Sequence, residues 1–193
     1  MNKSISLDQL KSNRFNTNKL VKALFFLLFL SVIFSSCTSK KGLVPKSGFE
    51  KPSTKISKKY SELMDVSKKA IKNGKLYGFI DDWQGTKYQF GGLSKKGIDC
   101  SGLVYLAFKD VYEKEIPRMT SQQVEAIKRK YESQLKEGDL VFFDYEGKKF
   151  SHVGIYLQNG YYFHASTSKG VMVAKLKDPY TYKYFSRGGS LKN

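Results

Sequence analysis

The hydrophobic pattern begins with a short apolar run near the N-terminus. Lys19 and Lys22 accompany about a dozen apolar residues that end at Phe34, and two serines follow before Cys37. A membrane-spanning helix needs ~20 consecutive apolar residues, so this run is too short to span a bilayer. A basic start, a short apolar centre and small residues at the end are typical of a secretory signal peptide. We therefore predict a signal peptide over residues 1–36, cleaved before Cys37.

Helical spacing begins at Ser57. From there the apolar residues fall on one helical face as far as Ile71, and Gly74 follows as the expected end of the helix. A second short helix is expected over Tyr77–Trp83. The folded domain is therefore predicted to cover residues 57–193.

Two more helices are expected in the middle of the chain. A glycine loop leads into a helix of about three turns that begins at Cys100, with Asp99 as its N-cap. Further on, Thr120-Ser121-Gln122-Gln123 has the form of a capping box, which predicts a helix from there to about Lys130.

After Gly138 the pattern changes to short aromatic and β-branched segments separated by glycine-bearing turns. The four expected strands are Asp139–Tyr145, Phe150–Gln158, Tyr161–Ser166 and Gly170–Leu176. The predicted fold class is α+β, with N-terminal helices packed on an antiparallel β-sheet.

The chain contains only two histidines, His152 and His164, in the second and third of these strands. Asn159-Gly160 suits the two-residue turn that hairpins favour. In that register, the residue opposite His164 on the neighbouring strand would be an odd number of residues away from His152. It would therefore place the histidines on opposite faces of the sheet.

A three-residue loop over 158–160, with Gly160 left-handed as a bulge, pairs Leu157 with Tyr161 instead. This register joins six apolar residues into one face: Val153, Ile155, Leu157, Tyr161, Phe163 and Ala165. Burial favours it, because a one-residue slip exchanges the two faces of a strand. His152 and His164 then lie diagonally on the other face, ~7–8 Å apart between backbones.

Composition is consistent with one ordinary domain plus attachments, since 40% of the residues are hydrophobic and 15% are aromatic. The formal net charge is +17, of which residues 1–36 contribute +4 and residues 38–59 contribute +6. Residues 37–56 lack an apolar period and are predicted to be a flexible tether. On an exported protein this basic charge points to anionic envelope polymers or lipid headgroups and not to nucleic acid. A lysine-rich composition that serves solubility is an equal alternative.

Cysteine use suggests chemistry at Cys100. Phe34-Ser35-Ser36-Cys37 resembles a bacterial lipobox, in which the new N-terminal cysteine carries acyl chains. The alternative is a small buried or reactive cysteine after an ordinary signal peptide. If Cys37 is lipidated, Cys100 remains as a free thiol in an exported protein, where paired cysteines are the rule.

Cys100, His152 and His164 form a plausible nucleophile system. A helix N-terminus and a neighbouring imidazolium are expected to lower the pKa of the Cys100 thiol. His152 would act as the base, and His164 would orient it through the other ring nitrogen. The backbone N–H of Cys100 and the phenol of Tyr88 could stabilise an oxyanion. One cysteine and two histidines are too few ligands for a zinc site, so no metal and no cofactor is expected.

Six motifs together resemble the NlpC-type cell-wall peptidases, in the same order and over residues 57–193. The motifs are Gly85-Thr86-Lys87-Tyr88-Gln89-Phe90-Gly91-Gly92, Gly97-Ile98-Asp99-Cys100-Ser101-Gly102-Leu103-Val104, Ile116-Pro117-Arg118, Gly138-Asp139-Leu140-Val141-Phe142-Phe143, His152-Val153-Gly154-Ile155-Tyr156 and Phe163-His164-Ala165-Ser166. Phe90 stands where tryptophan is commoner in that family. The N-terminal recognition domain of many relatives has no counterpart here.

The resemblance implies a papain-like fold and hydrolysis of peptidoglycan stem peptides, commonly at the bond between γ-D-glutamate and a diamino acid. It implies Cys100 as the nucleophile, His152 as the base and His164 as the third polar residue. It also implies that Tyr88 bonds near the nucleophile and that Asp99 and Ser101 contact a free stem-peptide amine. Arg118 could bind a substrate carboxylate or be solvated.

Two other functions are compatible with the sequence. One is an amidase or acyltransferase that uses the same Cys-His chemistry, and the other is a lipid-tethered wall-binding protein without turnover. The expected partners are stem peptides and, through the lipid anchor, a membrane, and we expect a monomer. Thr38 is not the aspartate associated with inner-membrane retention, so we expect an outer-membrane lipoprotein facing the periplasm.

Overall fold

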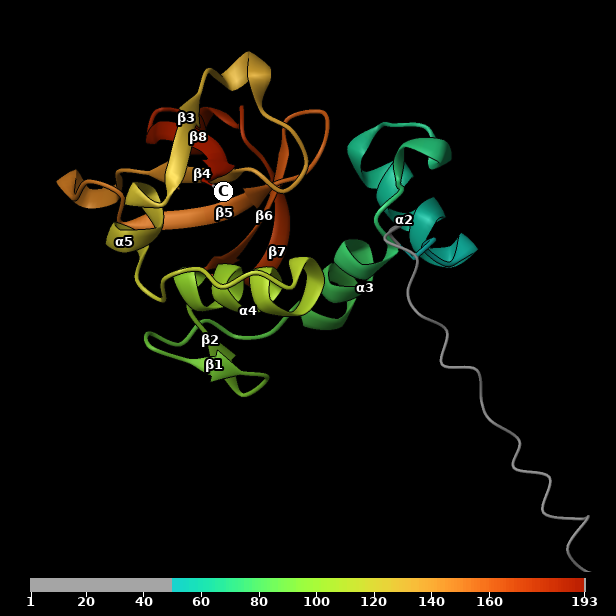
Figure 1. The fold of residues 1–193 in the computed structure, drawn as a ribbon, viewed down its shortest axis with the longest axis horizontal. Helices are drawn as coiled ribbons and strands as arrows, with labels where there is room; N and C mark the ends of the chain where they lie inside the picture. Colours follow the sequence, from blue (N-terminus) through green and yellow to red (C-terminus); the bar gives the residue numbers. More distant parts are fainter. Residues whose placement is uncertain (1–49, 193) are drawn as a thin grey trace, which may run out of the picture. The chain divides into compact units, whose positions relative to one another are not determined.

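Most of the strands belong to one antiparallel sheet (Figure 1). The computed structural model describes residues 50–192, in which six strands follow the order β3-β8-β4-β5-β6-β7. The strands are β3 (Ile127–Lys130), β4 (Leu140–Phe143), β5 (His152–Tyr156), β6 (Tyr161–Ser166), β7 (Gly170–Lys175) and β8 (Phe185–Leu191). The signal peptide predicted over 1–36, Cys37 and most of the predicted tether lie outside the described residues.

Helices precede most of the sheet in the chain, so the predicted α+β class is confirmed. The α-helices are α2 (Thr54–Met64), α3 (Gly74–Trp83), α4 (Cys100–Tyr112), α5 (Thr120–Glu125) and α6 (Pro179–Tyr182). Short 3-10 turns lie at Lys68–Ala70, Glu132–Gln134 and Tyr145–Gly147. A small hairpin of β1 (Leu93–Ser94) and β2 (Gly97–Ile98) comes directly before α4.

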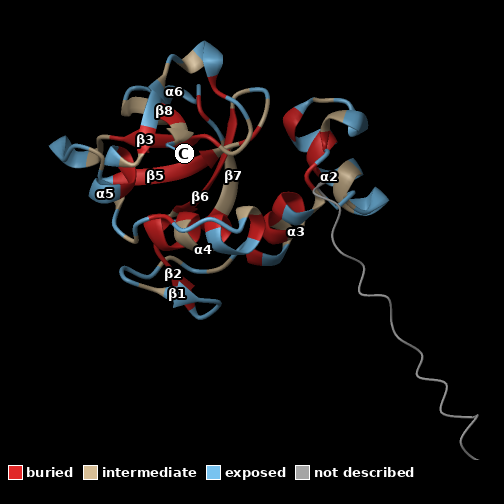
Figure 2. Cartoon of the chain, viewed as in Figure 1, coloured by how far each residue is buried: buried red, intermediate tan, exposed pale blue. Residues whose placement is uncertain are grey.

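The core lies between α4 and the sheet, where α4 packs on β5 and β6 (Figure 2). The buried residues of α4 include Leu103, Val104, Ala107, Phe108 and Val111. They meet the face of the hairpin that carries Val153, Ile155 and Phe163. Full burial of such a side chain contributes roughly 1.5–3 kcal/mol each. This packing fixes the first residue of α4, which is Cys100, relative to β5.

The helix predicted from Ser57 to Ile71 is wrong in both bounds. α2 begins at Thr54 and ends at Met64, where Asp65 adopts a left-handed conformation. Gly74 begins α3 and does not end the preceding helix, because the side chain of Asn73 accepts a hydrogen bond from the Leu76 N–H at 3.0 Å. The sequence contained this N-cap signal, but the apolar period outweighed it in our prediction.

The capping box predicted at Thr120 is also wrong. α5 ends at Glu125, and no side chain caps its N-terminus. The Gln123 side chain instead donates to the carbonyls of Ser101 and Pro117 at 3.0 and 2.8 Å. The chain continues as β3, which pairs with β8, and neither strand was expected. The pairing partner of β3 lies about 60 residues away, so local pattern could not indicate it.

The predicted register of the β5–β6 hairpin is confirmed. Ile155 lies opposite Phe163, and the Leu157 N–H donates to the Tyr161 carbonyl at 2.8 Å. The loop differs in one detail, since Asn159 as well as Gly160 has a positive φ, 51° and 75°. Asn159-Gly160 thus forms its own tight turn, closed by the Tyr161 N–H and the Gln158 carbonyl at 2.9 Å. Gln158 is the extra residue that keeps the odd register.

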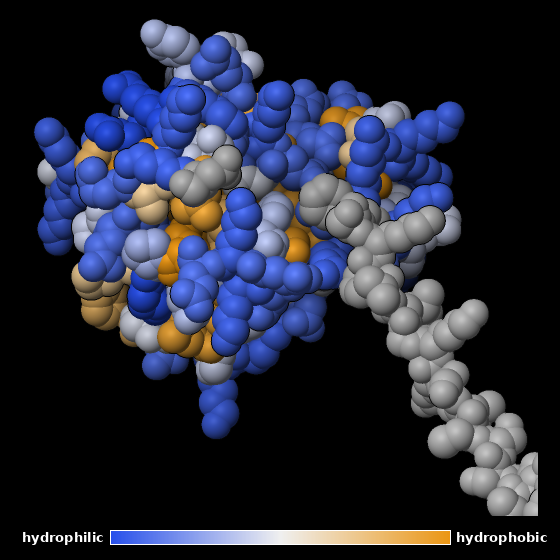
Figure 3. All heavy atoms as spheres, viewed as in Figure 1, coloured by the Kyte–Doolittle hydropathy of each residue, from blue (hydrophilic) through white to orange (hydrophobic). Residues whose placement is uncertain are grey.

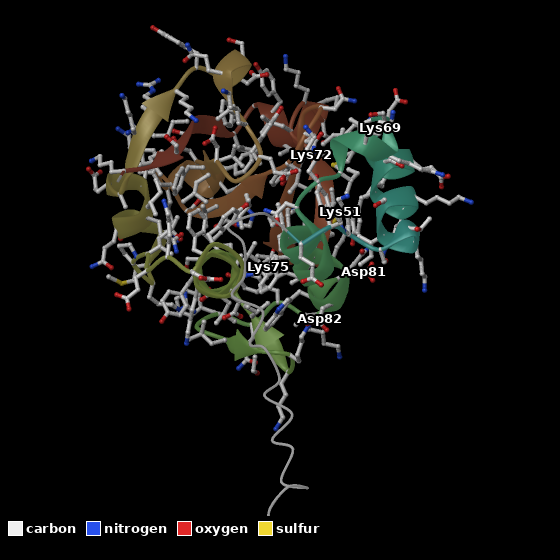
Figure 4. All side chains as sticks on the ribbon, turned by 45° about the vertical axis from the view of Figure 1, so that its right-hand side comes forward. Lys51, Lys69, Lys72, Lys75, Asp81 and Asp82 are labelled. Atoms are coloured by element: carbon white, nitrogen blue, oxygen red, sulfur yellow. The ribbon has the colours of Figure 1, made fainter. Side chains whose placement is uncertain are left out.

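The surface is largely hydrophilic, with separated hydrophobic patches on the face drawn in Figure 3. Figure 4 labels four lysines around the segment from the 3-10 turn at Lys68–Ala70 to the start of α3: Lys51, Lys69, Lys72 and Lys75. Lys75 pairs with Glu113 at 2.8 Å, and Lys59 pairs with Asp81 at 2.6 Å. These exposed pairs contribute little stability, because solvent screens them. Within residues 50–192, no helix has the length and apolar character needed to cross a membrane.

Candidate active site

Cys100 is the first residue of α4 and is only 5% exposed. Asp99 caps the helix, as predicted, because its Oδ1 accepts a hydrogen bond from the Gly102 N–H at 2.6 Å. The first N–H groups of a helix have no partner within it, so the backbone around Cys100 presents donors and positive partial charge. The sequence and the structure therefore agree on the position of the thiol.

Arg118 joins Asp99 and Ser101 in one buried network. Its Nη1 donates to Ser101 Oγ at 2.8 Å, and its Nη2 donates to Asp99 Oδ2 at 2.9 Å. The Gly91 N–H bonds to the same carboxylate oxygen at 2.8 Å. Burial disfavours the charged form of Asp99, but the hydrogen bonds from Arg118 and the backbone hold its pKa below the ordinary value. Arg118 is thus a structural partner of the N-cap and not a solvated side chain.

Gly102 permits this network. A Cβ at that position would lie 2.8 Å from the Gly92 carbonyl oxygen and 2.9 Å from the Arg118 guanidinium. Real Cβ atoms do not approach so closely, and the backbone carbonyl cannot rotate away. The glycine after Cys100-Ser101 is therefore required by the close approach of the 91–92 loop and Arg118 to the helix.

His152 and His164 are bonded to each other in the buried site. His152 Nε2 lies 2.7 Å from His164 Nδ1, and each histidine is 7% exposed. Gly154 lies between them on the sheet, where a Cβ would meet the Tyr162 ring at 2.7 Å and the His164 Cβ at 3.2 Å. The predicted diagonal contact is thus present, and the glycine provides the space for it.

This contact leaves Nδ1 as the ring nitrogen of His152 that can serve a reacting group. For Nδ1 to accept a proton, Nε2 must carry the hydrogen and donate it to His164 Nδ1. His164 Nε2 then carries its own hydrogen, and within residues 50–192 it has no hydrogen-bond partner. The ring of Tyr162 stacks beside it, 4.6 Å away between centroids.

The Cys100 thiol lies against the start of β5. The Val153 N–H and the Thr120 hydroxyl face the sulfur, and both lower the pKa of the thiol. Val153 follows His152 directly in the chain, and α4 packs on β5. The fold therefore places the thiol against the residue next to His152, although the sequence placed the two on different elements.

Protonation of the pair differs from the expectation. Burial raises the pKa of the Cys100 thiol, although hydrogen bonds from Val153 and Thr120 oppose this, and the Asp99 charge adds to the rise. Burial also lowers the pKa of His152 to about 4. Burial therefore favours a neutral thiol and a neutral imidazole in the substrate-free site, against the expected thiolate-imidazolium ion pair.

Alkylation of Cys100 should therefore be slow at neutral pH. With iodoacetamide, we expect the rate of modification to rise with pH beyond the range in which a free cysteine ionises, near pH 8.5, because burial raises the thiol pKa. The measurement is the alkylation rate from pH 5 to 10, by mass spectrometry. A fast plateau below pH 7 would contradict the neutral pair and indicate a resting thiolate.

Acid should weaken the folded state. His152 has its pKa lowered to about 4 and His164 is shifted in the same direction, so the unfolded chain binds more protons than the folded chain from pH 6.5 down to about 4. Stability is therefore lost as pH falls through this window, by about 3 kcal/mol for His152 alone. Urea unfolding at pH 7 and pH 4 measures this loss. A His152→Gln/His164→Gln variant should show a flatter dependence, and an equal slope would refute the assignment.

Tyr88 lies where the sequence predicts it, beside the nucleophile. The Gln89 N–H donates to the Ile98 carbonyl, and the Ile98 N–H donates to the Lys87 carbonyl, both at 3.1 Å. This bridge holds the tyrosine next to the segment that enters α4. Burial raises the pKa of Tyr88, and nearby Cys100 and Asp99 raise it further. The phenol keeps its proton and can donate to an oxyanion.

Three site residues were not predicted from the sequence. Gln123 is fully buried and ties Ser101 to the segment that carries Arg118. Thr120 faces the thiol and lowers its pKa. Tyr145 follows β4, and its ring lies 5.7 Å from that of His152. Only the Thr120 and Gln123 positions carried a local signal, and we interpreted it as a capping box.

A cavity of about 460 Å³ lies at the other end of α4, away from Cys100. Phe108, Tyr112, Gly138 and Leu191 are among its lining residues. It does not include any of the predicted catalytic residues. Among the described side chains, no cluster of three histidine, cysteine, aspartate or glutamate residues could hold a metal ion.

Comparison with known proteins finds the family that the sequence motifs resemble. The model of the NlpC/P60 family matches residues 85–189, which includes Tyr88, Cys100 and both histidines. The Escherichia coli K12 protein named murein DD-endopeptidase MepS/murein LD-carboxypeptidase is 35% identical over 163 residues, which are 81% of this chain and 85% of that one.

Two further matches cover a smaller share of the chain. The probable endopeptidase NlpC of Escherichia coli K12 is 42% identical over 107 residues, 55% of this chain and 70% of the relative. The crystal structure of the NlpC/p60 domain of the peptidoglycan hydrolase SagA superposes with a TM-score of 0.52 at 29% identity. This match covers 61% of this chain and 97% of that domain.

Proposed function

The chain belongs to the NlpC/P60 family, and from this premise we propose that it is a cysteine endopeptidase that hydrolyses peptide bonds in peptidoglycan stem peptides. The single observation that carries the proposal is the buried contact between His152 Nε2 and His164 Nδ1, on the strand whose next residue, Val153, faces the thiol of Cys100. It supplies an oriented base whose free nitrogen is available to the nucleophile.

The reaction proceeds by acyl transfer to sulfur. As Cys100 attacks the carbonyl carbon, His152 Nδ1 takes the thiol proton, and the oxyanion forms near the Cys100 N–H and the Tyr88 phenol. The C–N bond then breaks, and His152 returns the proton to the leaving amine. Water attacks the thioester, gives its proton to His152 and releases the acid, and the thiol regains its proton. His164 holds the imidazole throughout.

Two bonds are candidates for cleavage. The family resemblance favours the bond between γ-D-glutamate and the diamino acid. In substrates with a free amine, that assignment needs Asp99 and Ser101 as amine ligands, and both are buried and bonded to Arg118. This favours a second candidate, the D-alanyl cross-link, which suits the name of the Escherichia coli relative. A cross-linked substrate does not need to displace Arg118.

Digestion of defined muropeptides tests the proposal. The substrates are a monomeric stem peptide with a free N-terminus, the same peptide on its disaccharide, and a cross-linked dimer, each with wild-type protein and Cys100→Ala. Mass analysis of the fragments identifies the bond. Release of intact stem peptides would indicate an amidase, transfer to an added acceptor would indicate an acyltransferase, and binding without products would indicate a wall-binding protein. Each of these outcomes would overturn the endopeptidase assignment.

We also propose that Cys37 carries the lipid that anchors the protein in the envelope, with residues 1–36 as its signal peptide and 37–56 as the tether to the domain over 57–193. The basis is the sequence Phe34-Ser35-Ser36-Cys37. Two or more acyl chains give stable anchoring. Incorporation of labelled palmitate into wild-type protein, and its absence in Cys37→Ala, would support this. Equal labelling of both would refute it, and membrane fractionation tests the outer-membrane location.

A further inference from the structure

A row of three tyrosines leads away from the catalytic histidine. The ring of Tyr145 lies 5.7 Å from that of His152, Tyr184 lies 4.7 Å from Tyr145, and Tyr180 lies 5.6 Å from Tyr184. We call Tyr145, Tyr184 and Tyr180 the tyrosine row. The catalytic scheme above uses none of them.

Exposure increases along the tyrosine row. His152 is buried, Tyr145 and Tyr184 are half-buried, and Tyr180 is 63% exposed. Tyr180 lies on α6, which leads into β8 (Figure 2). Asp178 Oδ1 fixes the start of α6 by accepting from the N–H groups of Tyr180 and Thr181 at 3.1 and 3.3 Å. The row is therefore a supported path from the buried site to the surface.

The chemistry of the tyrosine row suits sugars. Aromatic faces carry negative charge density and attract the C–H groups on one face of a pyranose ring. The phenol hydroxyls add hydrogen bonds to sugar hydroxyl and amide groups. The ammonium of Lys183 lies 4.9 Å from the ring centroids of both Tyr180 and Tyr184, where it can meet a carboxylate of the substrate.

We propose that the tyrosine row binds the glycan strand of peptidoglycan while a stem peptide of that strand occupies the active site. This rests on the function proposed above. The three ring-to-ring steps span at most about 16 Å, the length of four or five extended residues. A sugar joined to a stem peptide of a few residues therefore reaches the outer part of the row when the peptide lies at His152.

The exposed side chains near the tyrosine row argue against a lipid surface as the occupant. The large exposed hydrophobic residues on α6 are Tyr180 and Tyr182, and Tyr131 precedes Glu132, which accepts a hydrogen bond from Tyr182. The exposed apolar residues Leu63, Phe90, Leu93 and Met119 lie on other segments. A surface that inserts into lipid needs aliphatic or phenylalanine side chains at its tip, because phenol hydroxyls resist transfer into hydrocarbon. The tyrosine row has no such side chains, and it begins beside the imidazole of His152.

The test compares two substrates that share one stem peptide, free in the first and attached to a glycan chain of several disaccharides in the second. The readout is the ratio of kcat/KM for the attached and the free peptide. Tyr180→Ala should lower this ratio about fivefold to tenfold, because one stacking contact is lost. Tyr180→Phe, which keeps the ring, should retain most of the ratio. Leu63→Ala, an exposed apolar residue on α2, is the matched control.

A binding measurement separates this inference from the proposed function. Cys100→Ala protein is titrated with peptide-free glycan strands and with phosphatidylglycerol vesicles, with and without Tyr180→Ala. Loss of glycan binding on Tyr180→Ala supports the inference, even if the wild-type protein cleaves neither substrate and the proposed function fails. An unchanged kcat/KM ratio, an equal loss on both substrates, or Tyr180-dependent binding to vesicles alone overturns it.

Discussion

Replacing Cys100 by alanine is expected to lower kcat/KM on cross-linked muropeptide by at least about 10⁴-fold. The sulfur forms the covalent bond in the proposed mechanism, and no other cysteine lies among residues 50–192. The residual rate reflects binding and the oxyanion donors alone. Product formation followed by mass spectrometry, at enzyme concentrations high enough to detect a slow rate, measures the loss.

The control for this variant is a check that it keeps the wild-type fold. Cys100 is buried at the first turn of α4, so alanine removes one small group from the core and should cost about 1 kcal/mol of unfolding free energy. An unchanged circular dichroism spectrum and retained binding to the muropeptide would separate lost chemistry from lost structure. Residual activity within tenfold of wild type would exclude Cys100 as the nucleophile.

His152 and His164 should differ in their effects. His152→Gln removes the base and is expected to cost about 10³–10⁴-fold in kcat. His164 acts through His152 and touches no reacting atom, so His164→Leu should cost less activity than His152→Gln. Steady-state kinetics on the same muropeptide tests this ranking. If loss of His164 costs more than loss of His152, the two roles are reversed.

His164→Asn distinguishes positioning from a purely structural role. Its amide oxygen can still accept a hydrogen bond from His152 Nε2, which leucine cannot. We expect Asn to recover a large part of the activity lost in His164→Leu and to restore the wild-type pH profile. If Asn and Leu lower activity equally and leave the profile unchanged, the 2.7 Å contact serves packing alone.

Local patterns predicted the parts of this protein whose partners are close in sequence. The start of α4 at Cys100 with Asp99 as its cap followed from one short segment, and it is present. The odd register of the β5–β6 hairpin followed from the alternation of apolar residues. Both are set within about 20 residues, where burial of one face or a cap allows a single arrangement.

Predictions failed where a local signal competed with distant partners. Gly74 resembled a helix end, but its N–H donates to the Glu50 carbonyl at 2.7 Å and it begins a new helix. Thr120 to Gln123 resembled a capping box, but Gln123 holds Ser101 and Pro117 instead. β8 has no strong alternation and is a strand because β3 and β4 flank it. Tertiary hydrogen bonds outweighed propensity in each case.

The sequence by itself named the candidate residues for the chemistry, because one helix cap, two histidines and one hairpin register suffice to select Cys100, His152 and His164. Only the tertiary structure decided their protonation and surroundings. Packing of α4 on β5 buries the thiol and the imidazoles together, and desolvation then favours their neutral forms over the expected ion pair. Packing also pairs Arg118 with Asp99 and places Tyr184 of the tyrosine row beside Tyr145, contacts between segments that are not adjacent in the chain.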